Sequence, residues 1–118
     1  MREKPRDPQR LEHILDNINS LLSAYKDGVL DNIQEKSLEY FGIIKLLEII
    51  GEAAYKLTHE FKDSHPETPW KYIVGMRHIL VHGYYQVNYK DVVKTIKEDL
   101  PYLKIQIEGY LKEISNNS

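Results

Sequence analysis

The segment from Gly75 to Tyr85, GMRHILVHGYY, places an arginine, two histidines and two tyrosines close together. Histidine, with an ordinary pKa of roughly 6.5, gives and takes protons near neutral pH. A guanidinium stays charged and fits the non-bridging oxygens of a phosphoryl transition state. These residue types are sufficient for RNA cleavage without a metal, in which a ribose 2′-hydroxyl attacks the adjacent phosphate.

The spacing constrains how these side chains meet. Arg77 and His82 are five residues apart, which is about 140° around an ideal helix, so they cannot share a face of a straight helix. Either the helix unwinds near Gly83, or two copies of the segment meet across a dimer axis. His78 and His82 do share a face, as do Arg77 and Tyr84. Tyr84 would position a phosphate or stack on a base.

A second interpretation of the same segment is a metal site. His78 and His82 have the i, i+4 spacing of a ligand pair. Cysteine is absent and the sequence HExxH does not occur, so further ligands would have to come from His59, Asp63 or His65 through tertiary folding. The pair alone is a weak signal for a metal.

A third interpretation is purely structural. His78 would cap or pack, His82 would satisfy the C-terminal end of its helix, and Arg77 would pair with a carboxylate. Glu52 is one carboxylate that would orient Arg77 or a histidine from across the fold. Its neighbours are small residues that permit close helix approach, namely Gly51, Ala53 and Ala54.

Length and composition set limits on the partners. The chain has 118 residues, which predicts one domain over 1–118 with frayed ends at 1–7 and 115–118. Its net charge of −2 gives no global attraction to RNA or to a membrane, so any phosphate would be bound locally. The absence of cysteine and of a long apolar run predicts a cytoplasmic, soluble protein with no membrane partner.

Four amphipathic segments are expected to position the site. Apolar residues recur at helical spacing from Leu11 to Tyr25, after a start at Asp7 and Pro8, and again from Leu38 to Phe61. KDGVLDN predicts a turn between these two segments, and KDSHPETPW predicts a linker after the second.

The third helix is expected to begin with Thr68 as cap and Pro69 in its first turn, and to end at Gly83 in a left-handed conformation. Asn88 would start the fourth helix, in which Pro101 predicts a kink or a restart from Asp99. No segment has β alternation. The expected fold is therefore an all-α, antiparallel four-helix bundle.

Several separate blocks occur in the order found in one known family. IIGEAAYKL, HPETPWKYIVGMRHILVHGYY and TIKEDLPYLKIQIE resemble the HepT-like branch of the HEPN superfamily, most closely from Ile49 to Leu103. The resemblance implies an all-α bundle that forms a homodimer, with the two signature segments facing one another across a cleft. It also implies ribonuclease activity, usually that of the toxin in a toxin-antitoxin pair.

The resemblance also implies roles for individual residues. The catalytic arginine and histidine of the family fall on Arg77 and His82, and its signature tyrosine falls on Tyr84. His78 stands where the family often has Asn or Asp, which leaves the division of labour between the two histidines open. No cofactor or metal is implied. The usual partner is an MNT-type nucleotidyltransferase antitoxin, which can transfer AMP to the tyrosine and so block RNA binding.

Two functions are therefore expected. The first is a metal-independent endoribonuclease that uses Arg77 and His82, with His78, Tyr84 and Glu52 as positioning groups. The second is a catalytically inactive dimeric module that binds a nucleotidyltransferase.

Overall fold

The computed structural model describes residues 7–83 and 86–117, and within those ranges every regular element is a helix. The expected all-α class is confirmed. The elements are α1 (Asp7–Lys26), η1 (Val29–Asn32), α2 (Leu38–Lys56), α3 (His59–Ser64), α4 (Trp70–His82), α5 (Tyr89–Lys94), the π turn η3 (Thr95–Asp99) and α6 (Leu100–Asn116).

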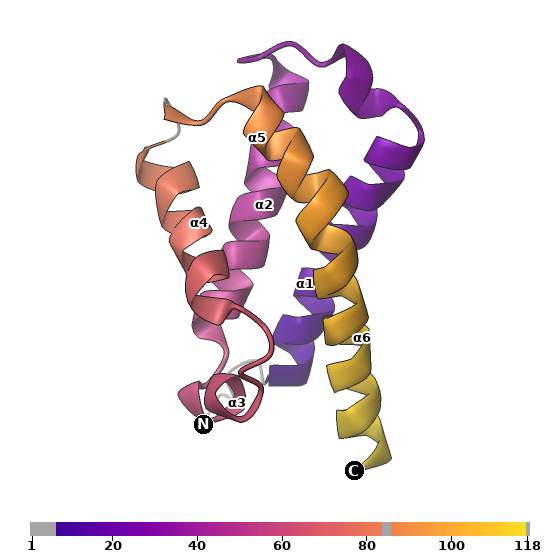
Figure 1. Cartoon of the computed structure of the whole chain (residues 1–118), viewed down its shortest axis with the longest axis vertical. Coiled ribbons are helices and arrows are strands. Elements are labelled where there is room, and N and C mark those ends of the chain that lie inside the picture. The colour runs from indigo at the N-terminus through magenta and orange to yellow at the C-terminus, as the bar shows by residue number, and fades with distance from the viewer. Residues whose placement is uncertain (1–6, 84–85, 118) are drawn as a thin grey trace, which may run out of the picture.

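Helix α2 packs against both α1 and α4, and α6 packs against α1. In Figure 1, α3 and the C-terminal end of α6 lie at one end of the molecule, and the connection from α1 to α2 and the start of α5 lie at the other. The most completely buried side chains come mainly from α1, α2, η3 and α6, and include Leu11, Ile18, Ile50, Ile96 and Ile107. No helix in the described part of the chain has the length and apolar character needed to cross a membrane.

The second predicted helix is broken in two. Instead of continuing from Leu38 to Phe61, α2 ends at Lys56, and Leu57 is extended. Thr58 then caps α3, because its Oγ1 accepts the Phe61 N–H at 3.1 Å. The carboxylate of Asp7 accepts the Thr58 N–H at 3.0 Å and its hydroxyl at 2.7 Å. Asp7, predicted to start the first helix, is the first residue of α1 and fixes this break.

Two details of the third predicted helix are also wrong. Helix α4 begins at Trp70 with Pro69 as its N-cap, whereas Thr68 is 2% exposed and donates a hydrogen bond to Gln106 Oε1 at 2.8 Å. Gly83 does end the helix, as predicted. Its φ is −127°, however, so it is not left-handed; its N–H bonds the Ile79 carbonyl at 2.7 Å.

The last helical stretch begins after Asn88, whose side chain accepts the Asp91 N–H, as predicted. The disruption expected at Pro101 takes the form of the π turn Thr95–Asp99, in which the Leu100 N–H reaches the Thr95 carbonyl. Proline lacks the N–H that a continuous α-helix would use, and the π turn rearranges the pairing just before it. Helix α6 restarts after Asp99 and runs to Asn116.

Candidate functional site

Arg77 lies where α4 approaches α2 very closely. A Cβ atom added to the buried Gly51 would collide with the Cβ of Arg77, and would stand 3.2 Å from its Cα. Only a glycine allows the two backbones to come this near. Gly51 therefore sets how close the Arg77 side chain lies to α2, as the small residues around Glu52 suggested.

The predicted contact between Glu52 and Arg77 is present. Arg77 Nε lies 2.8 Å from Glu52 Oε1, and Lys56 Nζ lies 3.3 Å from Glu52 Oε2. Glu52 Oε1 is buried and has no hydrogen-bond partner among the described residues, so the contact with Arg77 is an ion pair without hydrogen-bond alignment. The side chains of Arg77 and Glu52 are 32% and 36% exposed, which leaves the group open to a ligand from solvent.

Lys56 was not among the residues predicted for the site. Its position four residues after Glu52 was the available signal, because such a pair lies on one helix face. The structure thus joins two cations, Arg77 and Lys56, through one carboxylate.

The two histidines of α4 are exposed and lie side by side. The ring centroids of His78 and His82 are 4.8 Å apart with an interplanar angle of 53°. Helix α4 continues through His82, so the predicted unwinding that would bring His82 round to Arg77 is wrong. Within one chain, Arg77 faces α2 while His82 projects from another side of α4.

The remaining histidines predicted as possible ligands do not join this group. His59 is exposed in the first turn of α3. His65 follows α3, and its Nδ1 and Nε2 lie 2.8 Å from the Phe61 carbonyl and 3.0 Å from Glu113 Oε1. Among the described residues, no three His, Asp or Glu side chains are grouped to hold a metal ion.

The pKa of His65 reflects its contacts. Burial lowers it, but the hydrogen bonds to Glu113 and to the Phe61 carbonyl outweigh burial, so that the pKa of His65 is raised overall. Both ring nitrogens face acceptors, and only the protonated ring donates from both. His65 therefore holds α6 against the residues that follow α3.

Tyr84, the predicted positioning and AMP-accepting residue, lies outside the described residues.

The fold and the site define an all-helical protein in which one helix presents an arginine ion pair and two exposed histidines. The family model described as ribonuclease HepT-like matches residues 14–109. The chain belongs to the HepT-like ribonuclease family.

Similar proteins from archaea and bacteria are consistent with this family. A candidate RNase of Methanocaldococcus jannaschii, MJ1380, is 35% identical over 98 residues, which cover 83% of this chain and 90% of the relative. A candidate RNase of Caldanaerobacter subterraneus, TTE0752, is 36% identical over 103 residues, which cover 87% of this chain and 92% of the relative. A candidate ribonuclease HepT of Thermococcus cleftensis is 46% identical over 72 residues, which cover 61% of this chain and 66% of the relative. No solved structure matches the chain significantly.

Proposed function

We propose that the chain is a metal-independent endoribonuclease in which His82 is the general acid or base and Arg77 stabilises the transition state. The observation that carries this proposal is that a ribonuclease family model spans the segment in which Arg77 is held by Glu52 and His82 is open to solvent. The similar proteins named as candidate RNases support RNA as the substrate class.

The active cleft in this proposal lies between two copies of the chain. Arg77 and His82 occupy different sides of α4, so a single copy does not pair them, whereas a two-fold axis would bring Arg77 of one copy toward His82 of the other. The face of α4 beside His82 supports a close contact. Gly75 is exposed with open space around it, and Tyr72 and Ile79 are 59% and 52% exposed. In each copy we infer an up-down four-helix HEPN bundle.

The chemistry follows from the residue types. A histidine takes the proton of the ribose 2′-hydroxyl as its oxygen bonds to phosphorus, and a protonated histidine gives a proton to the departing 5′-oxygen. The products are a 2′,3′-cyclic phosphate and a 5′-hydroxyl. Because Glu52 approaches Arg77 at Nε, we infer that the outer guanidinium nitrogens meet the non-bridging oxygens. His78 and Tyr84 position the substrate.

The biological role that we propose is that of the toxin in a HepT/MNT-type toxin-antitoxin pair in the cytoplasm. The partner is an MNT-type nucleotidyltransferase that transfers AMP to the hydroxyl of Tyr84. The added phosphate and nucleoside would block the cleft by charge repulsion and by their bulk. Family membership is the support for this role.

The nuclease assignment is tested by RNA cleavage with purified protein in EDTA. Wild type cleaves, and His82→Ala and Arg77→Ala each lose activity by about a hundredfold or more. His13→Ala is the matched control, because His13 is exposed on α1, and it keeps wild-type activity. Cleavage lost in EDTA and restored by zinc would favour the metal site, and full activity in His82→Ala would overturn the catalytic role.

The alternative is a catalytically inactive dimeric module that binds a nucleotidyltransferase. It is favoured by the ion pair with Glu52, which neutralises Arg77 in the single chain. Growth arrest on expression separates the two functions. An arrest that disappears with His82→Ala fits the nuclease only, whereas an intact nucleotidyltransferase complex without any effect of His82→Ala on RNA fits the binding module.

A further inference from the structure

One helical turn beyond its contact with Arg77, α2 carries two exposed side chains that the proposed mechanism does not use. Gly51 packs against Arg77, and Glu52 forms the ion pair with its guanidinium. Four residues after these two come Tyr55 and Lys56. A four-residue step keeps roughly the same face of a helix and advances about 6 Å along its axis. That distance is similar to one nucleotide step of a single strand, so the nucleotide next to one bound at Arg77 would reach these side chains.

Lys56 sets the net charge of the group around Arg77. Glu52 alone would neutralise the arginine, but Lys56 Nζ lies 3.3 Å from Glu52 Oε2, so the three side chains together carry one net positive charge. The side chains of Lys56 and Glu52 are 46% and 36% exposed, which makes their ion pair weak. An ammonium has three donors on a flexible stem. Lys56 can therefore bind a phosphate while it still contacts Glu52.

Tyr55 offers an aromatic ring to solvent beside this charge, and it is 58% exposed. Lys62 of α3 donates a hydrogen bond from Nζ to the Tyr55 carbonyl at 3.2 Å, and the same Nζ lies 6.0 Å from the centroid of the tyrosine ring. Lys62 thus fixes the end of α2 and supports the ring. An exposed ring next to lysines is typical of surfaces that bind single-stranded RNA, because bases stack on the ring and ammonium groups bind phosphates.

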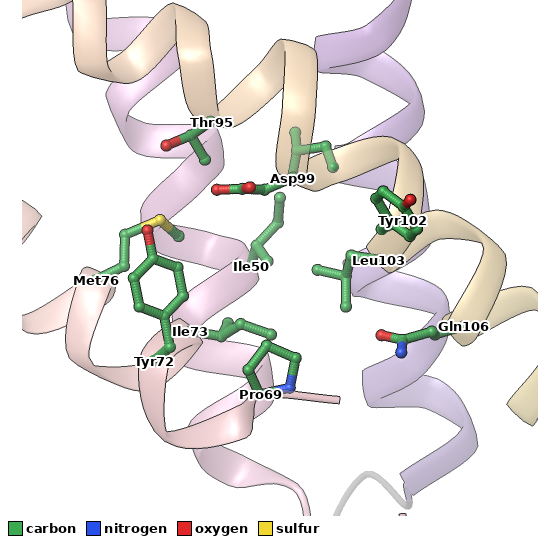
Figure 2. A pocket seen from close by; sticks show the side chains of 11 residues that line it. Ile50, Pro69, Tyr72, Ile73, Met76, Thr95, Asp99, Tyr102, Leu103 and Gln106 are labelled. Carbon is green, nitrogen blue, oxygen red and sulfur yellow. The ribbon is translucent and has the colours of Figure 1, made fainter. Parts of the chain in front are cut away.

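Another side of α4 has the opposite charge. A groove of about 330 Å³ lies there, between α4 and the segment formed by η3 and α6 (Figure 2). Among the described residues that line it, only Asp99 of the π turn is charged. Figure 2 shows Asp99 across the groove from Tyr72 and Met76. A carboxylate repels phosphate, so the strand is expected to leave Arg77 along α2 and not through this groove.

We propose that Lys56 and Tyr55 form a second nucleotide subsite beside the reacting phosphate. Lys56 binds the phosphate next to the scissile one, and Tyr55 stacks on a base of the same strand. This subsite rests on the proposed ribonuclease function and adds a substrate preference to it. Strands that extend beyond the scissile bond bind more tightly than a dinucleotide that has the scissile phosphate alone.

The test uses an octanucleotide with one ribonucleotide in a deoxyribonucleotide strand, so that only one bond has the 2′-hydroxyl needed for cleavage. Lys56→Gln raises the KM for this substrate by about tenfold and leaves kcat within about twofold, because the lost contact lies outside the reacting phosphate. Lys56→Arg keeps the charge and the wild-type KM. Tyr55→Ala raises the KM by about tenfold, whereas Tyr55→Phe keeps the ring and the wild-type KM.

One control is a substrate and one is a variant. A dinucleotide that ends at the scissile phosphate does not reach the subsite, so Lys56→Gln and Tyr55→Ala cleave it as wild type does. Lys26→Gln removes the same charge from a matched position. Lys26, like Lys56, is exposed in the last turn of its helix, but α1 ends at the other end of the molecule from α3 (Figure 1). It keeps wild-type kinetics on both substrates.

Binding of the all-deoxyribonucleotide strand, which is not cleaved, separates this subsite from the nuclease function. Lys56→Gln lowers the slope of log affinity against log salt concentration by about one, as the loss of one phosphate contact does. Binding that depends on Lys56, without cleavage of the ribonucleotide substrate, supports the subsite and overturns the nuclease.

Two results would overturn the subsite. The first is that wild type and Lys56→Gln bind the strand equally, whether strongly or not at all. The second is that Lys56→Gln loses cleavage of the dinucleotide as much as that of the octanucleotide, because its effect would then pass through Glu52 to Arg77.

Discussion

Two histidine-bearing regions of this molecule use the same side chain in opposite ways. His65, beside α3, is 14% exposed at its side chain, and both of its ring nitrogens have acceptors within hydrogen-bond distance. His78 and His82 on α4 are exposed and contact each other's rings. A histidine whose nitrogens are both engaged holds helices together, whereas an exposed one is free to exchange protons with a substrate.

The packing around His65 is also denser than the packing around Arg77. The ring of His65 stacks on Phe61 at 4.1 Å and meets Tyr110 edge-on at 4.5 Å, and Thr68 is hydrogen-bonded to Tyr110 at 2.5 Å. At Arg77, in contrast, the packing partner is a glycine, and the polar contact is an ion pair open to solvent. Dense aromatic packing fixes the ring of His65, whereas the ion pair of Arg77 stays partly exposed to solvent.

The largest expected effect comes from removing one histidine from each region. His82→Ala lowers RNA cleavage by about a hundredfold or more and leaves the free energy of unfolding within about 0.5 kcal/mol, as exposed positions do. His65→Ala keeps cleavage per folded molecule but lowers the free energy of unfolding by about 1–3 kcal/mol, because the partly buried Phe61 carbonyl loses its donor and the packing of the ring against Phe61 and Tyr110 is lost. Cleavage rates and urea titrations check both, and equal stability losses in the two variants would erase the contrast.

The next effect concerns the glycine contact. Gly51→Ala forces α4 away from α2, because the added methyl group collides with Arg77. We expect the free energy of unfolding to fall by about 1–3 kcal/mol, with a loss of cleavage as Arg77 moves. Gly42→Ala, on the same helix but in open space, is the matched control, and it should raise stability by up to about 1 kcal/mol. Thermal unfolding of both variants measures these changes in stability. An unchanged stability of Gly51→Ala would mean that the two helices have room to separate.

A smaller effect is expected from the carboxylate that holds Arg77. Glu52→Gln removes a partly exposed ion pair, which changes the free energy of unfolding by only about 0–1 kcal/mol. Cleavage should fall by roughly tenfold or more, because the guanidinium loses its orientation. Glu39→Gln, an exposed carboxylate in the first turn of the same helix, leaves cleavage unchanged. If both variants cleave like wild type, Glu52 has no positioning role.

The smallest effect is a pH dependence of stability that arises at His65. Its pKa is raised in the folded protein, so its contribution is fully present below the ordinary histidine pKa of roughly 6.5 and is lost as the pH rises through the folded pKa. Urea midpoints of wild type should therefore fall with rising pH relative to those of His65→Gln. Measurements below about pH 9 avoid ionisation of the tyrosines. A constant difference between the two proteins would show that His65 titrates no differently when folded.

Local patterns in the sequence predicted much of the secondary structure. The apolar spacing predicted α1, Asn88 predicted the start of α5, and Gly83 predicted the end of α4. Each of these depends on neighbours within a turn or two. The break at Thr58 was missed because the carboxylate that fixes it belongs to Asp7, which is 51 residues away. Thr68 was misassigned for the same reason, since its partners lie on α6.

The sequence by itself determined which groups this protein has for chemistry and which helix carries them, because residue type and helical spacing are local properties. The family membership and the contact between Glu52 and Arg77 were also foreseen from it. Only the tertiary structure decided which histidine is engaged and which is exposed, that Lys56 joins the ion pair, and that a groove opens beside the π turn. These depend on how closely separate helices approach, and that distance is set by side chains far apart in the chain.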